Sequence, residues 1–206
     1  MKKIKCEILD TYQDFLDYWT LASDKSVDEQ IELWQTYYMG KYPELLTKQV
    51  QSYEVDNIDW RKIAQKIFPS LRHRFQLMQR ARENILSTCR WAHARASEKL
   101  GLDFDIVFVI YVGVGCGAGW ATKYGEQPAV LLGLENIAEQ KWHVKNKLKG
   151  LVAHEIGHLA HMKWRNEWET FEKSEQDPLF LLYSEGFAQR CEHVILWKRD
   201  MAYGAR

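Results

Sequence analysis

The sequence has no net charge, and its few cysteines are widely separated. Its 206 residues include 28 basic and 28 acidic side chains, so the basic excess typical of nucleic-acid-binding proteins is absent. We therefore expect no nucleic-acid partner. The four cysteines lie far apart in the chain, without the close pairs of a four-cysteine zinc site. This pattern favours reduced thiols over a disulfide framework.

No uncharged stretch reaches the length of a typical membrane span. The longest, residues 106–122, has 17 residues and alternating glycines in its second half, short of the roughly 20 apolar residues of a membrane-spanning helix, so we expect no membrane partner. Lys2 and Lys3 are not followed by an apolar segment, which argues against a signal peptide. Together with the reduced cysteines, these absences predict a cytoplasmic protein.

Helical periodicity dominates the first hundred residues. Apolar positions spaced three and four apart predict helices over 12–21, 27–39 and 43–53, a short helix over 58–68, and a long helix over 70–100. Pro69 is expected to end the short helix, and Gly101 to end the long one as a C-terminal cap.

The pattern changes after residue 101. Residues 104–114 (FDIVFVIYVGV) are rich in β-branched and aromatic side chains and predict a strand. A second strand is predicted over 129–134, with 120–127 as a hairpin-type connection, and helices follow over 144–163 and 179–199. We predict an α+β fold in a single domain over 1–206: a mainly helical half (1–101) and a region (102–206) with a small antiparallel or mixed sheet and two helices.

One pentapeptide, HEIGH at 154–158, carries the candidate chemistry. Two histidines four residues apart lie on one face of a helix, so His154 and His158 can reach one metal ion. Glu155 between them can take a proton from water at the ion's remaining position. On a wheel stepped by about 100° per residue, the motif lies at the flank of an apolar face. A metal there is partly shielded from solvent.

A catalytic zinc site needs a third protein ligand. The metzincin arrangement would place glycine at 161 and histidine at 164, but the chain has His161 and Trp164 there. Three histidines on one straight helix converge poorly on one ion. We therefore expect His161 to support a ligand, to face substrate or to be solvated.

Glu185 is the candidate third ligand. It shares a mostly apolar helix face with Leu181 and Ala188, where an unpaired carboxylate is costly to bury. Gly186 beside it is expected to permit the close helix approach that a shared ion requires. A salt-bridged core glutamate is the alternative interpretation.

With these residues the chain resembles the gluzincin metallopeptidases, in which a second helix donates a glutamate to the His-Glu-x-x-His motif. Residues 184–188 (SEGFA) are especially similar to the Glu-Gly-Phe-Ala stretch of the aminopeptidase N group. The resemblance covers about residues 104–200. It implies one zinc ion per chain, held by His154, His158 and Glu185, with Glu155 as general base.

The resemblance also implies a strand edge that pairs with an extended peptide, for which 130–134 and 106–112 are the candidates. The chain departs from the aminopeptidase N group in its length, in its longer interval from His158 to Glu185, and in lacking a Gly-Ala-Met-Glu-Asn-like segment. Aminopeptidase specificity therefore does not carry over. The chain is more similar to compact bacterial predicted zinc-dependent proteases.

Other residues are candidates for supporting roles. Gln189 and Glu192 share the face of Glu185, so either can accept a hydrogen bond from a ligating imidazole. Oxyanion stabilisation needs a tyrosine or histidine, and His193 is slightly favoured. The other candidates are Tyr183, Tyr203, Tyr124 and His143.

A run of alternating glycines over 113–119 lacks the third glycine of a dinucleotide fingerprint and the lysine of a phosphate loop. It predicts a tight turn or bulge beside the cleft. Cys116 within it is expected to be a buried or exposed thiol and not a metal ligand.

The sequence therefore predicts a zinc metallopeptidase that acts on a peptide or protein. One alternative is a non-catalytic interaction protein, in which a fourth protein ligand such as His161 or Cys116 closes the zinc site. Another is a zinc hydrolase acting on a non-peptide amide or ester.

Overall fold

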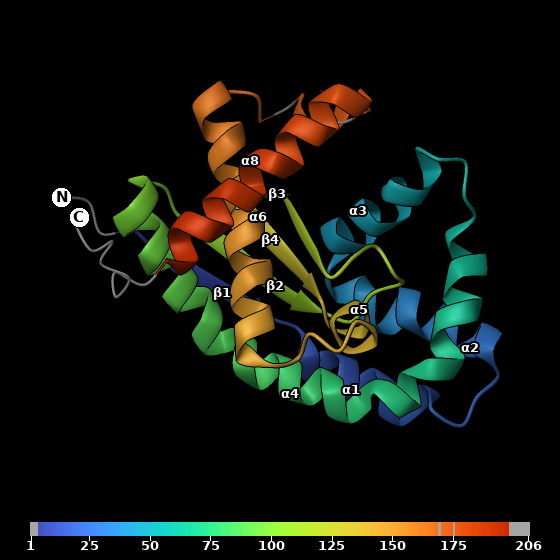
Figure 1. The fold of residues 1–206 in the computed structure, drawn as a ribbon. Coiled ribbons are helices and arrows are strands. Elements are labelled where there is room, and N and C mark those ends of the chain that lie inside the picture. Colours follow the sequence, from blue (N-terminus) through green and yellow to red (C-terminus); the bar gives the residue numbers. More distant parts are fainter. Residues whose placement is uncertain (1–3, 169, 175, 198–206) are drawn as a thin grey trace, which may run out of the picture.

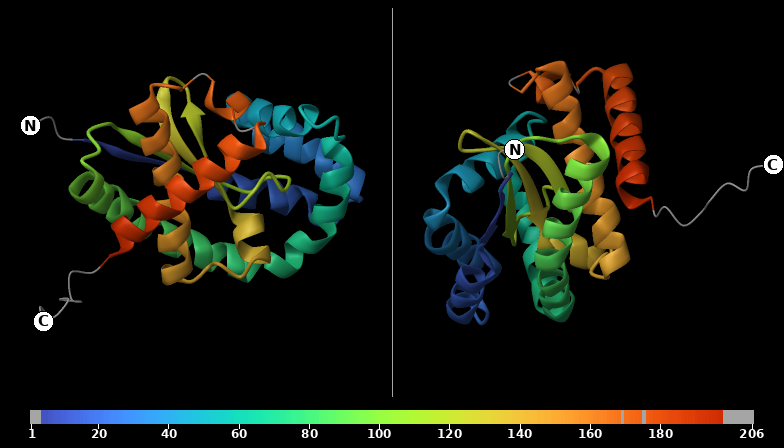
Figure 2. Two further views of the ribbon diagram at one scale, coloured as in Figure 1. Left: turned by 45° about the horizontal axis from the view of Figure 1, so that its top comes forward. Right: turned by 90° about the vertical axis from the view of Figure 1, so that its left-hand side faces the viewer.

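The computed structural model describes residues 4–168, 170–174 and 176–197. Four strands form one sheet, with α1, α2 and α3 on one side and α6 and α8 on the other (Figures 1 and 2). This architecture confirms the predicted α+β class, with a helical N-terminal region and C-terminal helices beside a small sheet. None of the helices in these ranges combines the length and apolar character needed to cross a membrane.

The sheet is mixed, with the strand order β1-β2-β4-β3. β1 (Cys6–Asp10) pairs parallel to β2 (Ile106–Tyr111), and β2 pairs parallel to β4 (Gln127–Gly133). β3 (Gly119–Tyr124) pairs antiparallel to β4. Every residue of β2 is buried, as expected for a strand covered on both faces.

Two strands differ from the sequence prediction. β1 was not predicted, because its five residues carry little pattern and its hydrogen bonds come from a strand about a hundred residues away. The segment 120–127, predicted as a connection, holds most of β3. A turn at Gly125, where φ is +58°, joins β3 to β4.

The expected peptide-binding edge is also corrected. The candidates 106–112 and 130–134 lie in β2 and β4, which are central strands paired on both sides. The edge strand next to α6 is β3.

The first helical layer packs an aromatic core against the sheet. It consists of α1 (Tyr12–Ala22), α2 (Val27–Leu33), η1 (Trp34–Tyr38), η2 (Met39–Lys41) and α3 (Pro43–Glu54). Ser26 and Glu29 form a capping box that starts α2. The indole of Trp34 donates a hydrogen bond of 3.1 Å to the carbonyl of Val112, which fixes this layer to the end of β2.

The long helix α4 (Trp60–Leu100) contradicts the prediction of two helices separated at Pro69. It continues through Pro69 because Phe68 and Leu71 are both buried, so packing on either side outweighs the lost backbone hydrogen bond. α4 is bent in Figure 1, as expected of a helix with an internal proline. Gly101 ends it at φ +68°, which confirms the predicted cap.

The C-terminal helices carry the motif residues. α5 (Leu134–Glu139) follows β4, then α6 (Lys145–Arg165), the short α7 (Phe171–Ser174) and α8 (Pro178–Leu196). The Asp177 side chain caps α8 by accepting a 2.8 Å hydrogen bond from the amide of Leu179. The predicted end of this helix at Arg199 lies outside the described residues.

Gly157 brings α6 and α8 together. A Cβ atom at position 157 would lie 2.9 Å from both the Cα and the carbonyl oxygen of Ala188. The expectation that Gly186 permits this approach is wrong, because a Cβ at 186 would have no neighbour within 4 Å. Gly157, inside the HEIGH motif, is therefore the small residue at the contact between α6 and α8.

Gly157→Ala is therefore expected to destabilise the protein by about 1–3 kcal/mol, because the new methyl group meets backbone atoms that cannot rotate away. Gly186→Ala is the matched control and is expected to be neutral or to stabilise by up to about 1 kcal/mol through helix propensity. Urea unfolding of both variants measures this difference. Equal unfolding free energies would contradict the packing argument.

Candidate metal site

His154, His158 and Glu185 form one group of metal-ligand type. Their nearest ligand atoms all lie within 4.8 Å of one another. The Nε2 atoms of His154 and His158 are 3.2 Å apart. Glu185 places Oε2 3.2 Å from Nε2 of His154 and Oε1 3.5 Å from Nε2 of His158. Zinc bonds of about 2.0–2.2 Å in tetrahedral geometry separate ligand atoms by roughly 3.3–3.6 Å. The donor set therefore fits a single zinc-sized ion.

The two histidines meet because both lie on α6, one turn apart. Glu185 comes from the first half of α8, which crosses α6 at Gly157. The side chain of Glu185 is 52 % exposed, so the expectation that this carboxylate is buried is wrong. Packing between the helices places this carboxylate at the histidines.

His158 is held as a neutral imidazole. Burial, with smaller contributions from His154 and His161, lowers its pKa to about 3. The hydroxyl of Ser184 lies 3.1 Å from Nδ1 of His158. When Nδ1 of His158 carries the proton and donates a hydrogen bond to Ser184, Nε2 keeps its lone pair. That lone pair then faces the metal-ligand group, as a metal ligand requires.

Ser184 was missed by the sequence analysis. Its position directly before Glu185 in the SEGFA segment was the available signal, but contact with a histidine 26 residues earlier depends on how the helices cross.

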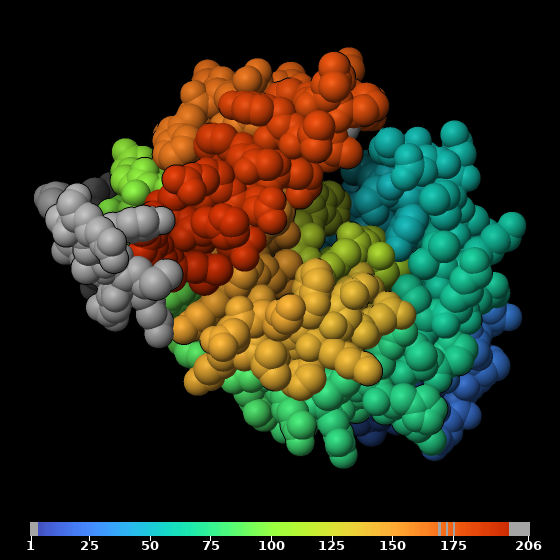
Figure 3. All heavy atoms as spheres, viewed as in Figure 1, coloured from blue at the N-terminus to red at the C-terminus, as the bar shows by residue number. Residues whose placement is uncertain are grey.

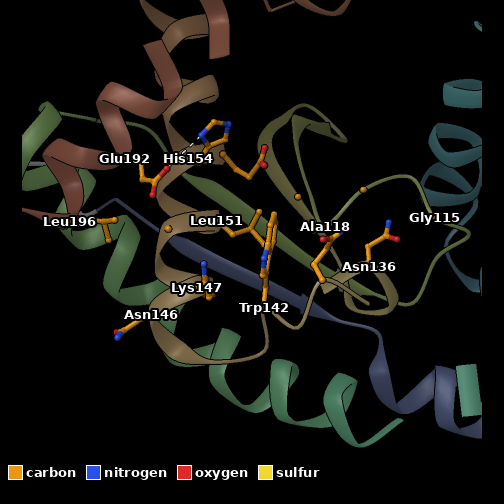
Figure 4. Close-up of a pocket in the computed structure, with 15 residues that line it drawn as sticks. Gly115, Ala118, Asn136, Trp142, Asn146, Lys147, Leu151, His154, Glu192 and Leu196 are labelled. Carbon is orange, nitrogen blue, oxygen red and sulfur yellow. Dashed lines mark ion pairs between the residues drawn. The ribbon is translucent and has the colours of Figure 1, made fainter. Parts of the chain in front are cut away.

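The structure brings one predicted supporting residue to the group. Oε2 of Glu192 lies 3.7 Å from Nδ1 of His154, an ion-pair distance rather than a direct hydrogen bond (dashed in Figure 4). Gln189 and His193 are exposed on α8. Tyr183 is also exposed and packs its ring against His161. Tyr203 lies outside the described residues.

Glu155 lies between the metal-ligand group and the edge strand. Its side chain is buried and lines both cavities that flank the group. A Cβ atom at Gly119 would lie 2.4 Å from Oε1 of Glu155. The lack of a side chain at the start of β3 therefore leaves the space that this carboxylate occupies.

The two cavities differ in size and lining. The larger has a volume of about 800 Å³, and the smaller has a volume of about 160 Å³. The larger opens on the face in Figure 3, as a hollow between α8 and the chain around α5 and the start of α6. The smaller is lined by the three residues of the metal-ligand group together with Trp120, Met162 and Phe171. His154, Glu155 and Gly119 line both, so the cavities meet at the motif.

The glycine run forms the predicted tight turn beside the cleft. Gly115 and Gly117 have φ values of +90° and +127°, and both line the larger cavity. The Glu135 carboxylate accepts backbone hydrogen bonds from Gly113 (2.8 Å) and Gly115 (3.1 Å). Burial raises the pKa of Glu135, while these hydrogen bonds oppose the shift. This carboxylate fixes the loop.

Cys116 is not part of the metal-ligand group. Its Sγ contacts the hydroxyl of Ser52 at 3.5 Å and the carbonyl of Gln49 at 3.7 Å. Burial raises the pKa of the Cys116 thiol to about 11, so it is neutral near pH 7. The expectation of an ordinary thiol is confirmed.

His161 is neither a ligand nor solvated. It is 1 % exposed, and neither ring nitrogen has a hydrogen-bond partner among the described residues. Four aromatic rings surround it, those of Phe171, Phe180, Tyr183 and Phe187. Burial lowers its pKa, so the neutral ring packs as an aromatic core residue between α6, α7 and α8.

Fold and site together define an α+β protein with a His-His-Glu group that could hold one metal ion. No protein-family model, curated protein or solved structure matches this chain at a significant level.

Zinc binding tests the group directly. Replacing His158 or Glu185 by glutamine is expected to weaken zinc affinity by more than about 100-fold, the upper range for residues that only orient ligands. His193→Gln removes an exposed histidine of α8 and is expected to bind zinc as the wild type does. Competition with a zinc-sensitive dye measures all three variants. Unchanged affinity in the first two would exclude the site.

Proposed function

We propose that this protein is a zinc-dependent metallopeptidase of the gluzincin pattern, with His154, His158 and Glu185 as zinc ligands. The single observation that carries the proposal is the distance set of 3.2, 3.2 and 3.5 Å among their ligand atoms, with Glu155 on the same turn of α6. When bound, zinc supplies Lewis acidity, which polarises a carbonyl oxygen and makes water reactive near neutral pH.

Glu155 is the general base in this proposal. It accepts a proton as water adds to the carbonyl carbon of the peptide bond, and it delivers the proton to the nitrogen when the carbon–nitrogen bond breaks. Its place between the ligands and β3 supports this role, because a peptide along the strand edge would bring its carbonyl to the carboxylate.

The donor count supports a catalytic site over a structural one. Structural zinc sites are closed by four protein ligands, whereas catalytic sites keep one position open. Among the described residues the group has three members. Cys116 contacts Ser52, and His161 lies in its aromatic cluster, so neither named candidate for a fourth ligand belongs to the group.

Glu155→Gln tests the general base. It is expected to retain zinc and to lose peptide hydrolysis by about 10²–10⁴-fold, because the amide cannot accept the proton. Glu126→Gln makes the same chemical change at an exposed turn and is expected to keep full activity. Cleavage of a peptide library followed by mass spectrometry measures both. A zinc-loaded Glu155→Gln protein as active as the wild type would rule out the mechanism.

Gly119→Ala tests the placement of Glu155. The added methyl group overlaps the carboxylate at 2.4 Å, and the flexible glutamate side chain is expected to move while the fold and zinc content stay intact. We expect hydrolysis to fall at least about tenfold, since a misplaced proton acceptor loses much of its effect. Gly40→Ala is the control, because its nearest new contact is an ordinary 3.8 Å. Equal activity of the two variants would remove the positioning role of Gly119.

A further inference from the structure

The larger cavity carries charge of opposite sign at different places along its length. Near the metal-ligand group it is lined by Glu155 and Glu192. Lys147, in the first turn of α6, is the one lysine or arginine among its described lining residues. Figure 4 shows Lys147 with Trp142 and Leu151 in the middle of the cavity, between Glu192 on one side and Asn136 on the other.

Lys147 is available to a ligand. Its side chain is exposed, and it forms no ion pair with the described residues. The neighbouring Lys149 instead places its ammonium 4.4 Å from the ring centre of Trp91, on α4. The amides of Asn136, Gln140 and Asn146 add further hydrogen-bonding groups to the lining. An ammonium group with amides and an indole is a suitable environment for a carboxylate on a peptide.

The direction of β3 relates this cavity to one side of the substrate. The chain passes from the larger cavity, lined by Gly117 and Ala118, into the smaller one, lined by Trp120 and Ala121. A peptide paired antiparallel to β3 would run the opposite way, from the smaller cavity past Glu155 into the larger. The residues that follow the cleaved bond would then lie beside Lys147.

The distance along α6 sets the position that Lys147 can recognise. Seven residues separate it from His154, which corresponds to about 10 Å of helix at 1.5 Å per residue. An extended peptide advances about 3.4 Å per residue. For a peptide that follows α6, a carboxylate two or three residues beyond the cleaved bond would therefore come within reach of the ammonium group.

We propose that the larger cavity binds the leaving-group side of the substrate, and that Lys147 selects peptides with a carboxylate within three residues after the cut. This inference rests on the proposed peptidase function and specifies its substrate class. The carboxylate comes either from an aspartate or glutamate side chain or from the free C-terminus of a short peptide.

Two readouts test the proposal on the full-length, zinc-loaded protein. The first is retention of random heptapeptides by the Glu155→Gln protein, compared between a library with free C-termini and one with amidated C-termini. The second is the pattern of sites cut by the wild type in the same libraries. Retention is repeated with Lys147→Gln or Lys145→Gln added to the Glu155→Gln protein, and cleavage is repeated with each lysine variant alone. Lys145→Gln is the control, because it removes an exposed lysine of the same turn outside the cavity lining.

We expect peptides with a carboxylate to be retained about tenfold better than neutral ones, the effect of one charge-assisted hydrogen bond. Lys147→Gln should abolish this preference, and Lys145→Gln should keep it. Enrichment of Asp and Glu in the amidated library identifies side chains as the source. Retention only with free C-termini identifies the chain end.

The proposal is overturned by retention that ignores carboxylates, by a preference that survives Lys147→Gln, or by acidic residues enriched only before the cut. Wild-type cleavage with neither an acidic residue nor a free C-terminus favoured within three residues after the cut would leave the peptidase function standing and remove this inference. Carboxylate-dependent retention that requires Lys147, without any hydrolysis by the wild type, would remove the peptidase function. It would leave a carboxylate-binding site in a protein that is not a peptidase.

Discussion

The close contact of α6 with α8 at Gly157 is the constraint on which the site depends. The methyl group of an alanine there would lie 2.9 Å from the backbone of Ala188, so only glycine permits the observed approach. This approach places Glu185 against two histidines that α6 already holds one turn apart. It also brings Ser184 to His158 and Glu192 toward His154. One helix contact thus sets both the donor group and its supporting side chains.

The opposite wall of the site depends on the edge strand and the glycine turn before it. Buried Glu135 holds that turn through the amides of Gly113 and Gly115, and Gly119 leaves room for the Glu155 carboxylate. Helices therefore supply the donor atoms, whereas the turn and the segment before α6 shape the larger cavity. Such a division lets loop residues such as Trp142 change the shape of the larger cavity without moving the donor group.

The features predicted correctly from the sequence are those that depend on local periodicity. The helices that carry the motif and Glu185, the strand over β2 and the cap at Gly101 all follow from spacing and glycine conformation. The errors share another cause, which is long-range packing. Burial on both sides of Pro69 continues α4, and pairing with β2 creates β1. The exposed Glu185 and the open surroundings of Gly186 could not be read from a helical wheel, which does not show what a face contacts.

The sequence by itself determined the pairing of His154 with His158 around Glu155, because four residues of α-helix fix that geometry whatever surrounds them. It also determined that no basic excess exists for a nucleic-acid partner. Only the tertiary structure decided that Glu185 meets those histidines, that β3 is the edge strand beside them, and that His161 is an aromatic core residue. These outcomes join segments far apart in the chain, so they depend on how helices cross and strands pair and not on any local pattern.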